Sequence, residues 1–179
     1  ITNCVIIGNN PDYGDSKNYG GGIYCNNSSP KIINCVIIGN NADEGGGIYC
    51  NNSSPKIINC TISENIANYG GGIYCKSSSP TILNNILTRN NDYGIYCKKF
   101  SGSSSPFIDY NNIWNNRSGD YSNCPAGPRD ISADPIFVSS SDYHLQPASP
   151  CIDAGSNTAP GIPSTDKDGN PRIIDGNSD

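Results

Sequence analysis

Short apolar runs alternate with polar turns along most of the chain, and the whole pattern repeats. From Gly20 onward, the order Gly-Gly-Gly-Ile-Tyr-Cys, a polar turn, Ile-Ile-Asn-Cys and a further apolar run returns every 25 residues. Pro30, Pro55 and Pro80 mark this period, and Pro106 follows after a slightly longer turn. Runs this short, rich in Ile and bounded by Gly, Asn, Ser and Pro, are typical of β-strands separated by tight turns. A fixed period of this length predicts stacked copies of one unit.

Two or three strands per unit match one coil of a parallel β-helix, in which each strand pairs with its counterpart about 4.8 Å away. We therefore expect an all-β solenoid over residues 1–122, followed by a loop-rich β module over residues 123–179 that caps the coils or serves as an anchor. Because side chains alternate along a strand, three aliphatic columns are expected to point inward and form the core. The columns are Ile1, Ile32, Ile57, Ile82 and Ile108; Ile6, Ile37, Ile62, Leu87 and Ile113; and Ile23, Ile48, Ile73 and Ile95.

Two further columns consist of asparagine. They are Asn3, Asn34, Asn59 and Asn84, and Asn9, Asn40, Asn65, Asn90 and Asn116. Asparagine tolerates left-handed bends, and its amide can bond to the copies above and below, so both columns predict ladders at the turns. The triple glycines are expected to supply positive φ before each Gly-Ile-Tyr-Cys strand.

Nine cysteines in 179 residues indicate an oxidising compartment. Zinc is the competing use, but the Cys-x-x-Cys spacing is absent and the chain has one His. We expect cysteines that flank the same turn to form disulfides. The four cysteines that follow Cys60 are expected to pair with one another, and Cys4 is expected to stay unpaired. The expected disulfides are Cys25–Cys35, Cys50–Cys60, Cys75–Cys97 and Cys124–Cys151. Pairing down the columns, as in Cys25–Cys50, Cys75–Cys97 and Cys35–Cys60, is the alternative, since a step of about 4.8 Å also permits it.

Acidic residues gather on one loop column. Asp12 and Asp15 lie in an insertion of the first coil, and Asp43 and Glu44 lie at the equivalent bend of the next coil. Stacking would bring these carboxylates within one or two coil heights of each other, and carboxylate oxygens suit Ca²⁺. They are the candidate Ca²⁺ site, and no other cofactor is expected. The alternative is a solvated loop whose charges keep this edge soluble.

Other polar motifs favour structural roles. The segment 166–170 has the Asp-x-Asp-Gly pattern of a calcium loop but lacks the bidentate Glu at its far end, so we interpret it as a turn. His144 has no Ser or Cys nucleophile context. Glu64 and Arg89 fall in one column on successive coils and are expected to pair.

Charge and length exclude some partners. A net charge of −5 and a pI near 4.6 argue against nucleic acid, which requires clustered Lys and Arg. No apolar stretch approaches the length of a membrane span. Six asparagines lie in Asn-x-Ser/Thr triplets and are possible glycosylation sites. They are Asn26, Asn27, Asn51, Asn52, Asn59 and Asn116.

The repeat unit resembles the right-handed parallel β-helix repeats of bacterial secreted and surface proteins in the pectin-lyase-like superfamily, over residues 1–116. The tail resembles the choice-of-anchor Q module, through Asp134-Pro135-Ile136-Phe137-Val138, Asp142-Tyr143-His144-Leu145-Gln146-Pro147, Ser149-Pro150-Cys151-Ile152-Asp153-Ala154-Gly155 and residues 166–172. The resemblance implies an extracellular or cell-surface location and right-handed coils. It implies no reaction, since such folds carry lyases, hydrolases and members without known activity.

These observations favour a non-catalytic extracellular structural or adhesion module, with no catalytic residues assigned. The alternatives are a Ca²⁺-dependent polysaccharide lyase or glycoside hydrolase, and a carbohydrate-binding module. Residues 1–4 align with residues 32–35, so we expect the chain to begin inside a coil, with upstream coils or a cap missing.

An open coil with an apolar outer face predicts end-to-end or lateral self-association, or docking on upstream domains of the same protein, with glycans as further possible partners. The expected interface consists of Val5, Ile7, Ile33, Val36, Ile38 and Ile58.

Overall fold

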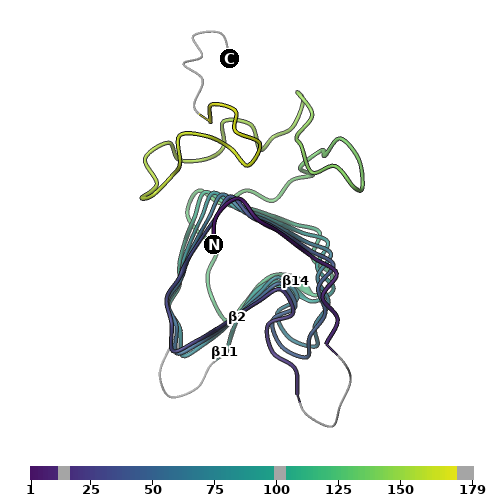
Figure 1. Cartoon of the computed structure of the whole chain (residues 1–179), viewed down its shortest axis with the longest axis vertical. Coiled ribbons are helices and arrows are strands. Elements are labelled where there is room, and N and C mark those ends of the chain that lie inside the picture. Colours follow the sequence, from purple (N-terminus) through teal and green to yellow (C-terminus); the bar gives the residue numbers. More distant parts are fainter. Residues whose placement is uncertain (12–16, 99–103, 173–179) are drawn as a thin grey trace.

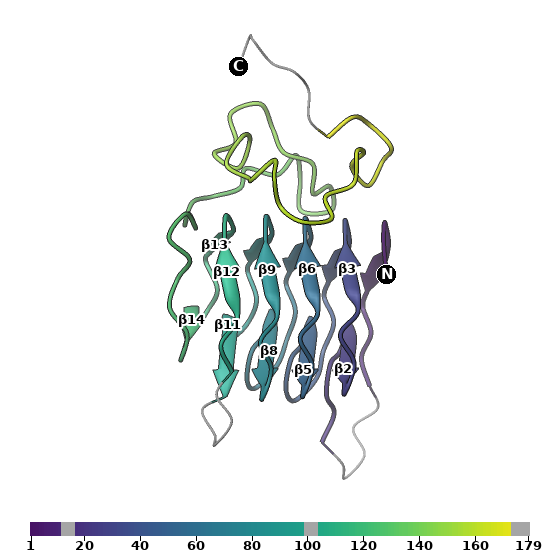
Figure 2. The same ribbon diagram turned by 90° about the vertical axis from the view of Figure 1, so that its left-hand side faces the viewer.

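The computed structural model describes residues 1–11, 17–98 and 104–172. Within these ranges the protein is an all-β solenoid whose strands pair in parallel from coil to coil (Figure 1). Seen from the side, the coils stand next to one another along a single axis (Figure 2). The described part of the chain contains no helix long and apolar enough to cross a membrane. The predicted right-handed parallel β-helix is therefore confirmed.

The strands form three sheets that run along the coil axis. Sheet I contains β1 (Val5–Ile7), β4 (Val36–Ile38), β7 (Thr61–Ser63), β10 (Ile86–Thr88) and β13 (Asn112–Trp114). Sheet II contains β2 (Ile23–Asn26), β5 (Ile48–Asn51), β8 (Ile73–Lys76), β11 (Tyr93–Lys98) and β14 (Gly119–Ser122). Sheet III contains β3 (Lys31–Ile33), β6 (Lys56–Ile58), β9 (Thr81–Leu83) and β12 (Phe107–Asp109).

The sheet register places equivalent residues of successive coils side by side. Ile57 pairs with Ile32 on one side and with Ile82 on the other. The three predicted aliphatic columns are confirmed as the core. Apart from Ile1 and Ile6 in the first coil, every member is at most 7% exposed. Each column therefore contributes a continuous row of buried side chains along the axis.

The two asparagine columns have different roles. Asn3, Asn34, Asn59 and Asn84 turn the corner between sheets III and I in the left-handed conformation, with φ between 54° and 56°. The other column forms the interior ladder, in which the amides of Asn40, Asn65 and Asn90 are buried and bond from coil to coil. The prediction of left-handed bends and stacked amides is confirmed, and each column carries mainly one of the two functions.

Only the first glycine of each triplet has the positive φ that the sequence predicts. Gly45 has a φ of 70°. Gly47 is needed for space instead, because a Cβ there would lie 2.6 Å from the backbone oxygen of Gly72 in the next coil. Close stacking of the coils, in addition to turn geometry, explains the triplets.

Residues 123–172 are called here the C-terminal segment. Its first part closes the last coil, where Cys124 packs on the core and Ile131 pairs with Asn112, and the rest lies along one side of the coils (Figures 1 and 2). The segment is rich in turns, and its internal pairing is limited to two isolated bridges among the described residues. It covers the outer face of sheet III, where Ala159 and Ile162 pack on Ile33, Ile58 and Leu83. A second apolar cluster therefore joins the segment to the coils.

Candidate functional site

A groove of about 620 Å³, called here the lateral groove, lies between the outer face of sheet I and the C-terminal segment. Its floor is the half-buried, outward-facing column Val36, Thr61 and Ile86. At the first coil the floor continues into Val5 and Ile7, which are 58% and 63% exposed. The groove is thus lined by a largely aliphatic strip that follows the coil axis.

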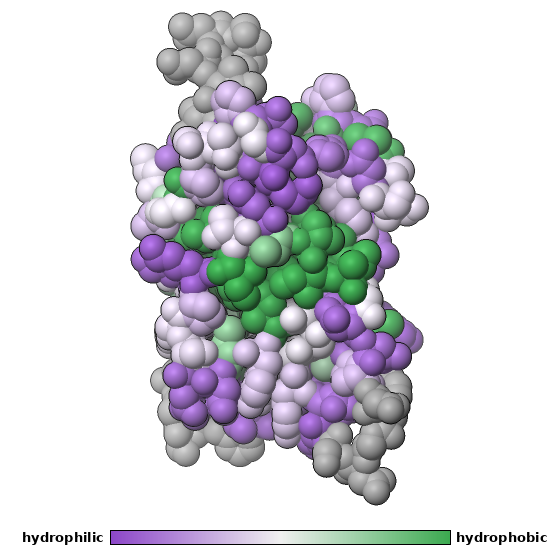
Figure 3. All heavy atoms as spheres, in the orientation of Figure 1, coloured by the Kyte–Doolittle hydropathy of each residue, from purple (hydrophilic) through white to green (hydrophobic). Residues whose placement is uncertain are grey.

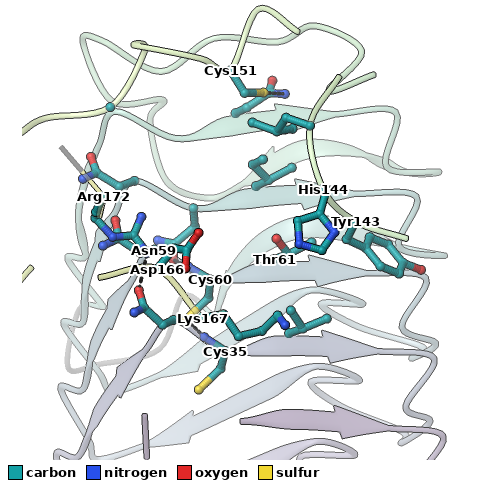
Figure 4. A pocket seen from close by; sticks show the side chains of 18 of the residues that line it. Cys35, Asn59, Cys60, Thr61, Tyr143, His144, Cys151, Asp166, Lys167 and Arg172 are labelled. Atoms are coloured by element: carbon teal, nitrogen blue, oxygen red, sulfur yellow. Dashed lines mark hydrogen bonds between the residues drawn. The ribbon is translucent and has the colours of Figure 1, made fainter. Parts of the chain in front are cut away.

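His144 stands on one rim of the lateral groove (Figure 4), and its ring nitrogens contact two carboxylates. Its Nδ1 contacts Asp142 Oδ1, and its Nε2 lies 2.8 Å from Asp168 Oδ2. The bonds to Asp142 and Asp168 raise the pKa of His144. Lys167 pairs with the second oxygen of Asp168. The contact between His144 and Asp168 therefore joins two parts of the C-terminal segment that are 24 positions apart.

The opposite rim is built from the corner asparagines. Asn34 accepts a hydrogen bond of 2.6 Å from Arg172 Nη2. Asn84 exchanges two bonds with the backbone of Ser156, at 2.8 and 2.9 Å. Asn59 lies between these contacts, and its Nδ2 is buried without a hydrogen-bond partner. Figure 4 shows Asn59 and Arg172 on this side, with Thr61 between them and His144.

The predicted pair of Glu64 and Arg89 is confirmed, with 3.5 Å between Arg89 Nη1 and Glu64 Oε1. The same carboxylate oxygen accepts a bond of 3.2 Å from the Tyr143 hydroxyl of the C-terminal segment. Burial, followed by the charge of Glu64, raises the pKa of Tyr143 to about 12. Glu64 therefore also anchors the segment, a role that the repeat pattern could not reveal.

The described residues include two of the four carboxylates of the candidate Ca²⁺ site, Asp43 and Glu44. Asp12 and Asp15 lie outside the described residues. Asp43 accepts bonds from the backbone of Asn18, at 2.8 Å, and from the side chain of Asn68, at 3.2 Å. No cluster of three or more His, Cys, Asp or Glu suited to a metal ion occurs in the described part of the chain. The Ca²⁺ site stays a prediction.

Glu44 is 5% exposed and faces two tyrosines. Its carboxylate accepts hydrogen bonds from the hydroxyls of Tyr49 and Tyr74, and it lies 3.7 Å from Lys17 Nζ. Burial is the main reason why the pKa of each of these two hydroxyls is raised, and the charge of Glu44 adds to it. Glu44 is thus a buried acceptor on the coil surface.

The outer face of sheet II carries a tyrosine ladder that the sequence analysis did not single out. The rings of Tyr49 and Tyr74 stack with centroids 5.0 Å apart. Around them, Tyr19, Tyr24 and Tyr69 are 39%, 49% and 51% exposed. The Ile-Tyr-Cys repeat was the available signal, since its Tyr must face outward when Ile and Cys face inward.

The sulfur contacts of the described residues run along the columns. Side-chain hydrogen bonds link Cys25 to Cys50, Cys50 to Cys75, Cys75 to Cys97 and Cys97 to Cys124. A second column links Cys35 to Cys60, and this bond lowers the pKa of Cys35 to about 6. All nine cysteines are free thiols. Of the expected disulfide partners, Cys75 and Cys97 are hydrogen-bonded neighbours, and the other contacts in the two columns match the column alternative; the connectivity itself stays a prediction.

Cys151 contacts no other sulfur among the described residues, and its Sγ accepts a hydrogen bond of 2.9 Å from Asn112 Nδ2. Its expected partner Cys124 bonds to Cys97 instead. Oxidation of the cysteines stays a prediction.

The C-terminal segment changes the surface expected for association. Ile33 and Ile58 are buried beneath it, and Ile38 is 6% exposed. Val5 and Ile7 stay exposed. Half of the expected interface is therefore covered, because an aliphatic sheet face recruits the chain's own Ala and Ile side chains. The association itself stays a prediction.

The six sequons differ in accessibility. Asn26, Asn27 and Asn52 are exposed, and Asn51 is half-buried. Asn116 is 7% exposed, and its amide nitrogen donates to Leu87 O at 3.1 Å. The amide nitrogen of Asn59 is also buried. Asn59 and Asn116 are therefore inaccessible in the folded chain, and glycosylation at the other sites stays a prediction.

Comparison with known proteins supports the fold. Residues 1–134 match the family described as the right handed beta helix region. No match is found among curated proteins or among solved structures. The family match covers the coils and ends inside the C-terminal segment, so the likeness of the tail to an anchor module stays a prediction. The stacked parallel sheets and this match together show that the chain belongs to the right-handed β-helix family.

Proposed function

We propose that this chain is a non-catalytic structural or adhesion module of an extracellular or cell-surface protein. The observation that carries the proposal is that charged side chains in and beside the lateral groove bind residues of this chain. Glu64 holds Tyr143 and Arg89, while His144 joins Asp142 and Asp168. These groups attach the C-terminal segment to the coils or close it on itself, which is a structural use of polar chemistry.

We propose further that the first coil binds a second copy of the chain or another β-helical domain. Figure 3 shows apolar side chains at the centre of this end face. Ile1, Val5 and Ile7 are 50%, 58% and 63% exposed there. β1 and β2 are the edge strands of sheets I and II, and edge strands offer unpaired backbone groups to a partner. Apolar contact and strand pairing would therefore act together.

Sedimentation velocity over a range of concentrations tests this association. The wild-type chain should form dimers or larger species, and the double variant Val5→Glu/Ile7→Glu should be monomeric. Val138→Glu is the matched control, since Val138 is 50% exposed on the C-terminal segment. A wild-type chain that stays monomeric at the highest concentration would overturn the proposed association. Release of reducing sugars from a uronate polymer, abolished by Asp43→Asn, would overturn the non-catalytic assignment.

Carbohydrate binding is a second candidate, favoured by the tyrosine ladder. Tyr19, Tyr24 and Tyr69 expose aromatic surface, and β2 and β5 of sheet II also carry the linked amides of Asn26 and Asn51. Aromatic rings next to amide groups offer an apolar body together with hydrogen-bonding partners. A glycan array that shows binding by the wild-type chain, and none by Tyr24→Ala, would support this function. An array on which the wild-type chain binds no glycan would contradict carbohydrate binding.

A further inference from the structure

The lateral groove has the size and lining of a small-molecule site. Its volume of about 620 Å³ lies within the range of such sites, which are mostly apolar with a few placed polar groups. The floor of Val36, Thr61 and Ile86 faces Leu145 and Ile152 of the C-terminal segment. Three coil steps separate Val5 from Ile86, so the apolar strip is about 14 Å long.

Two hydrogen-bond donors at the groove lack acceptors. Asn59 Nδ2 and Arg172 Nε are both buried without a partner, and both residues line the groove. The corner amides of Asn34 and Asn84 on either side are occupied by the C-terminal segment. A buried unpaired donor is unfavourable, and one on a guanidinium favours an anionic acceptor.

The charges around these donors restrict the ligand. Four carboxylates line the groove together with His144, Lys167 and Arg172, and they belong to Asp142, Asp153, Asp166 and Asp168. A doubly charged phosphate would meet repulsion from the four carboxylates, whereas a single negative charge can be matched by the guanidinium. The floor requires an apolar body. A carboxylate on a flexible aliphatic chain satisfies both conditions.

We propose that the lateral groove binds an amphiphile with one carboxylate and a medium-length acyl chain. The carboxylate accepts hydrogen bonds from Asn59 Nδ2 and Arg172 Nε, and the acyl chain lies on the strip formed by sheet I. The head-group site beside Asn59 and Arg172 is distinct from the proposed association surface, although the first-coil end of the apolar strip, Val5 and Ile7, belongs to both.

Isothermal titration calorimetry with dodecanoate, below its micellar concentration, tests the proposal. The wild-type chain should bind one molecule saturably. Arg172→Gln should weaken binding at least tenfold by removing the charge, and Thr61→Trp should abolish it by filling the groove. Lys56→Gln is the matched control, since it removes an exposed cation on sheet III outside the groove and should bind like the wild type. Thermal unfolding would verify that each variant is folded.

Two further ligands separate the contributions of head and tail. Butanoate should bind at least tenfold more weakly than dodecanoate because it lacks the chain, and dodecanol should do so because it lacks the charge. Absence of saturable dodecanoate binding, or equal binding by the wild type and Thr61→Trp, would overturn the proposal. Equal affinity for dodecanol and dodecanoate would overturn the carboxylate assignment. Displacement of dodecanoate by an uncharged extended peptide at lower concentration would assign the groove to a peptide instead.

Discussion

The interior asparagine ladder should contribute much of the stability of the fold, and Asn65 is the place to measure it. Its side chain is fully buried and makes four hydrogen bonds. The Nδ2 donates to Ile37 O at 3.0 Å and to Asn90 Oδ1 at 3.1 Å. The Oδ1 accepts from the backbone nitrogen and Nδ2 of Asn40, both at 3.0 Å. Asn65→Ala would remove all four bonds.

The expected loss follows from the net value of each bond. An intramolecular hydrogen bond contributes about 1 kcal/mol, so Asn65→Ala should lower the free energy of unfolding by about 4 kcal/mol. Asn9→Ala is the matched control, because Asn9 belongs to the same column but lies exposed in the first coil. Its amide makes one bond, of 2.8 Å to Asn40 Oδ1, so its loss should be at most about 1 kcal/mol.

Equilibrium unfolding in urea, followed by circular dichroism, gives both values. The midpoint should fall in proportion to the lost free energy, while the slope should stay unchanged because the surface exposed on unfolding is nearly the same. A loss for Asn65→Ala within about 1 kcal/mol of that for Asn9→Ala would refute the reasoning, because it would mean that buried amide bonds contribute no more than an exposed one.

Three further predictions concern the cysteines, His144 and the aliphatic core. One column holds five cysteines (Cys25, Cys50, Cys75, Cys97 and Cys124) and the other holds three (Cys4, Cys35 and Cys60). Pairing down the columns leaves one free thiol in each and Cys151 unpaired, so peptide mapping of the oxidised chain should find at least three free thiols. If Cys4 were the one free thiol, the disulfides would instead be those expected from the sequence, including those between cysteines that flank one turn. The raised pKa of His144 means that its stabilising contribution is complete below about pH 6.5 and is lost as the pH rises through the folded-state pKa. Urea unfolding at pH 5.5 and 8.5 should show this loss for the wild type, and equal losses for His144→Gln would exclude it. Ile62→Ala should lower the free energy of unfolding by about 2–5 kcal/mol, because the side chain is fully buried. Ile66 is 48% exposed, so Ile66→Ala should lower it by less than about 0.5 kcal/mol. Similar losses of stability for the two variants in thermal unfolding would contradict the assigned core.

The repeat pattern predicts the coils well because each position has equivalents in several copies. Ile32, Ile57 and Ile82 recur at a fixed spacing, so their shared inward orientation follows from one alternation rule. The same register brings equivalent cysteines of successive coils together. Cys25 and Cys50 are equivalent residues and therefore become direct neighbours, whatever their spacing from Cys35 within the coil.

The lateral groove could not be predicted in this way. One of its walls comes from the C-terminal segment, which carries no repeat, so no column relates His144 or Arg172 to a partner on the coils. The bond between Arg172 and Asn34 joins residues 138 positions apart. Contacts of that kind depend on surface complementarity after the coils have formed, and a turn-rich sequence gives no periodic signal of it.

The course of the C-terminal segment along the coils affects how the molecule comes apart. A solenoid in which each repeat contacts only its neighbours can open from either end, one repeat at a time. Here the segment is bonded to successive coils through Asn34, Glu64, Asn84 and Asn112. It therefore acts as a longitudinal tie, and the coils that it joins can separate only after several of its attachments have broken. A pulling force applied along the axis would be shared among several coils. A single proteolytic cut in the C-terminal segment would change cooperative unfolding into stepwise unfolding from the ends.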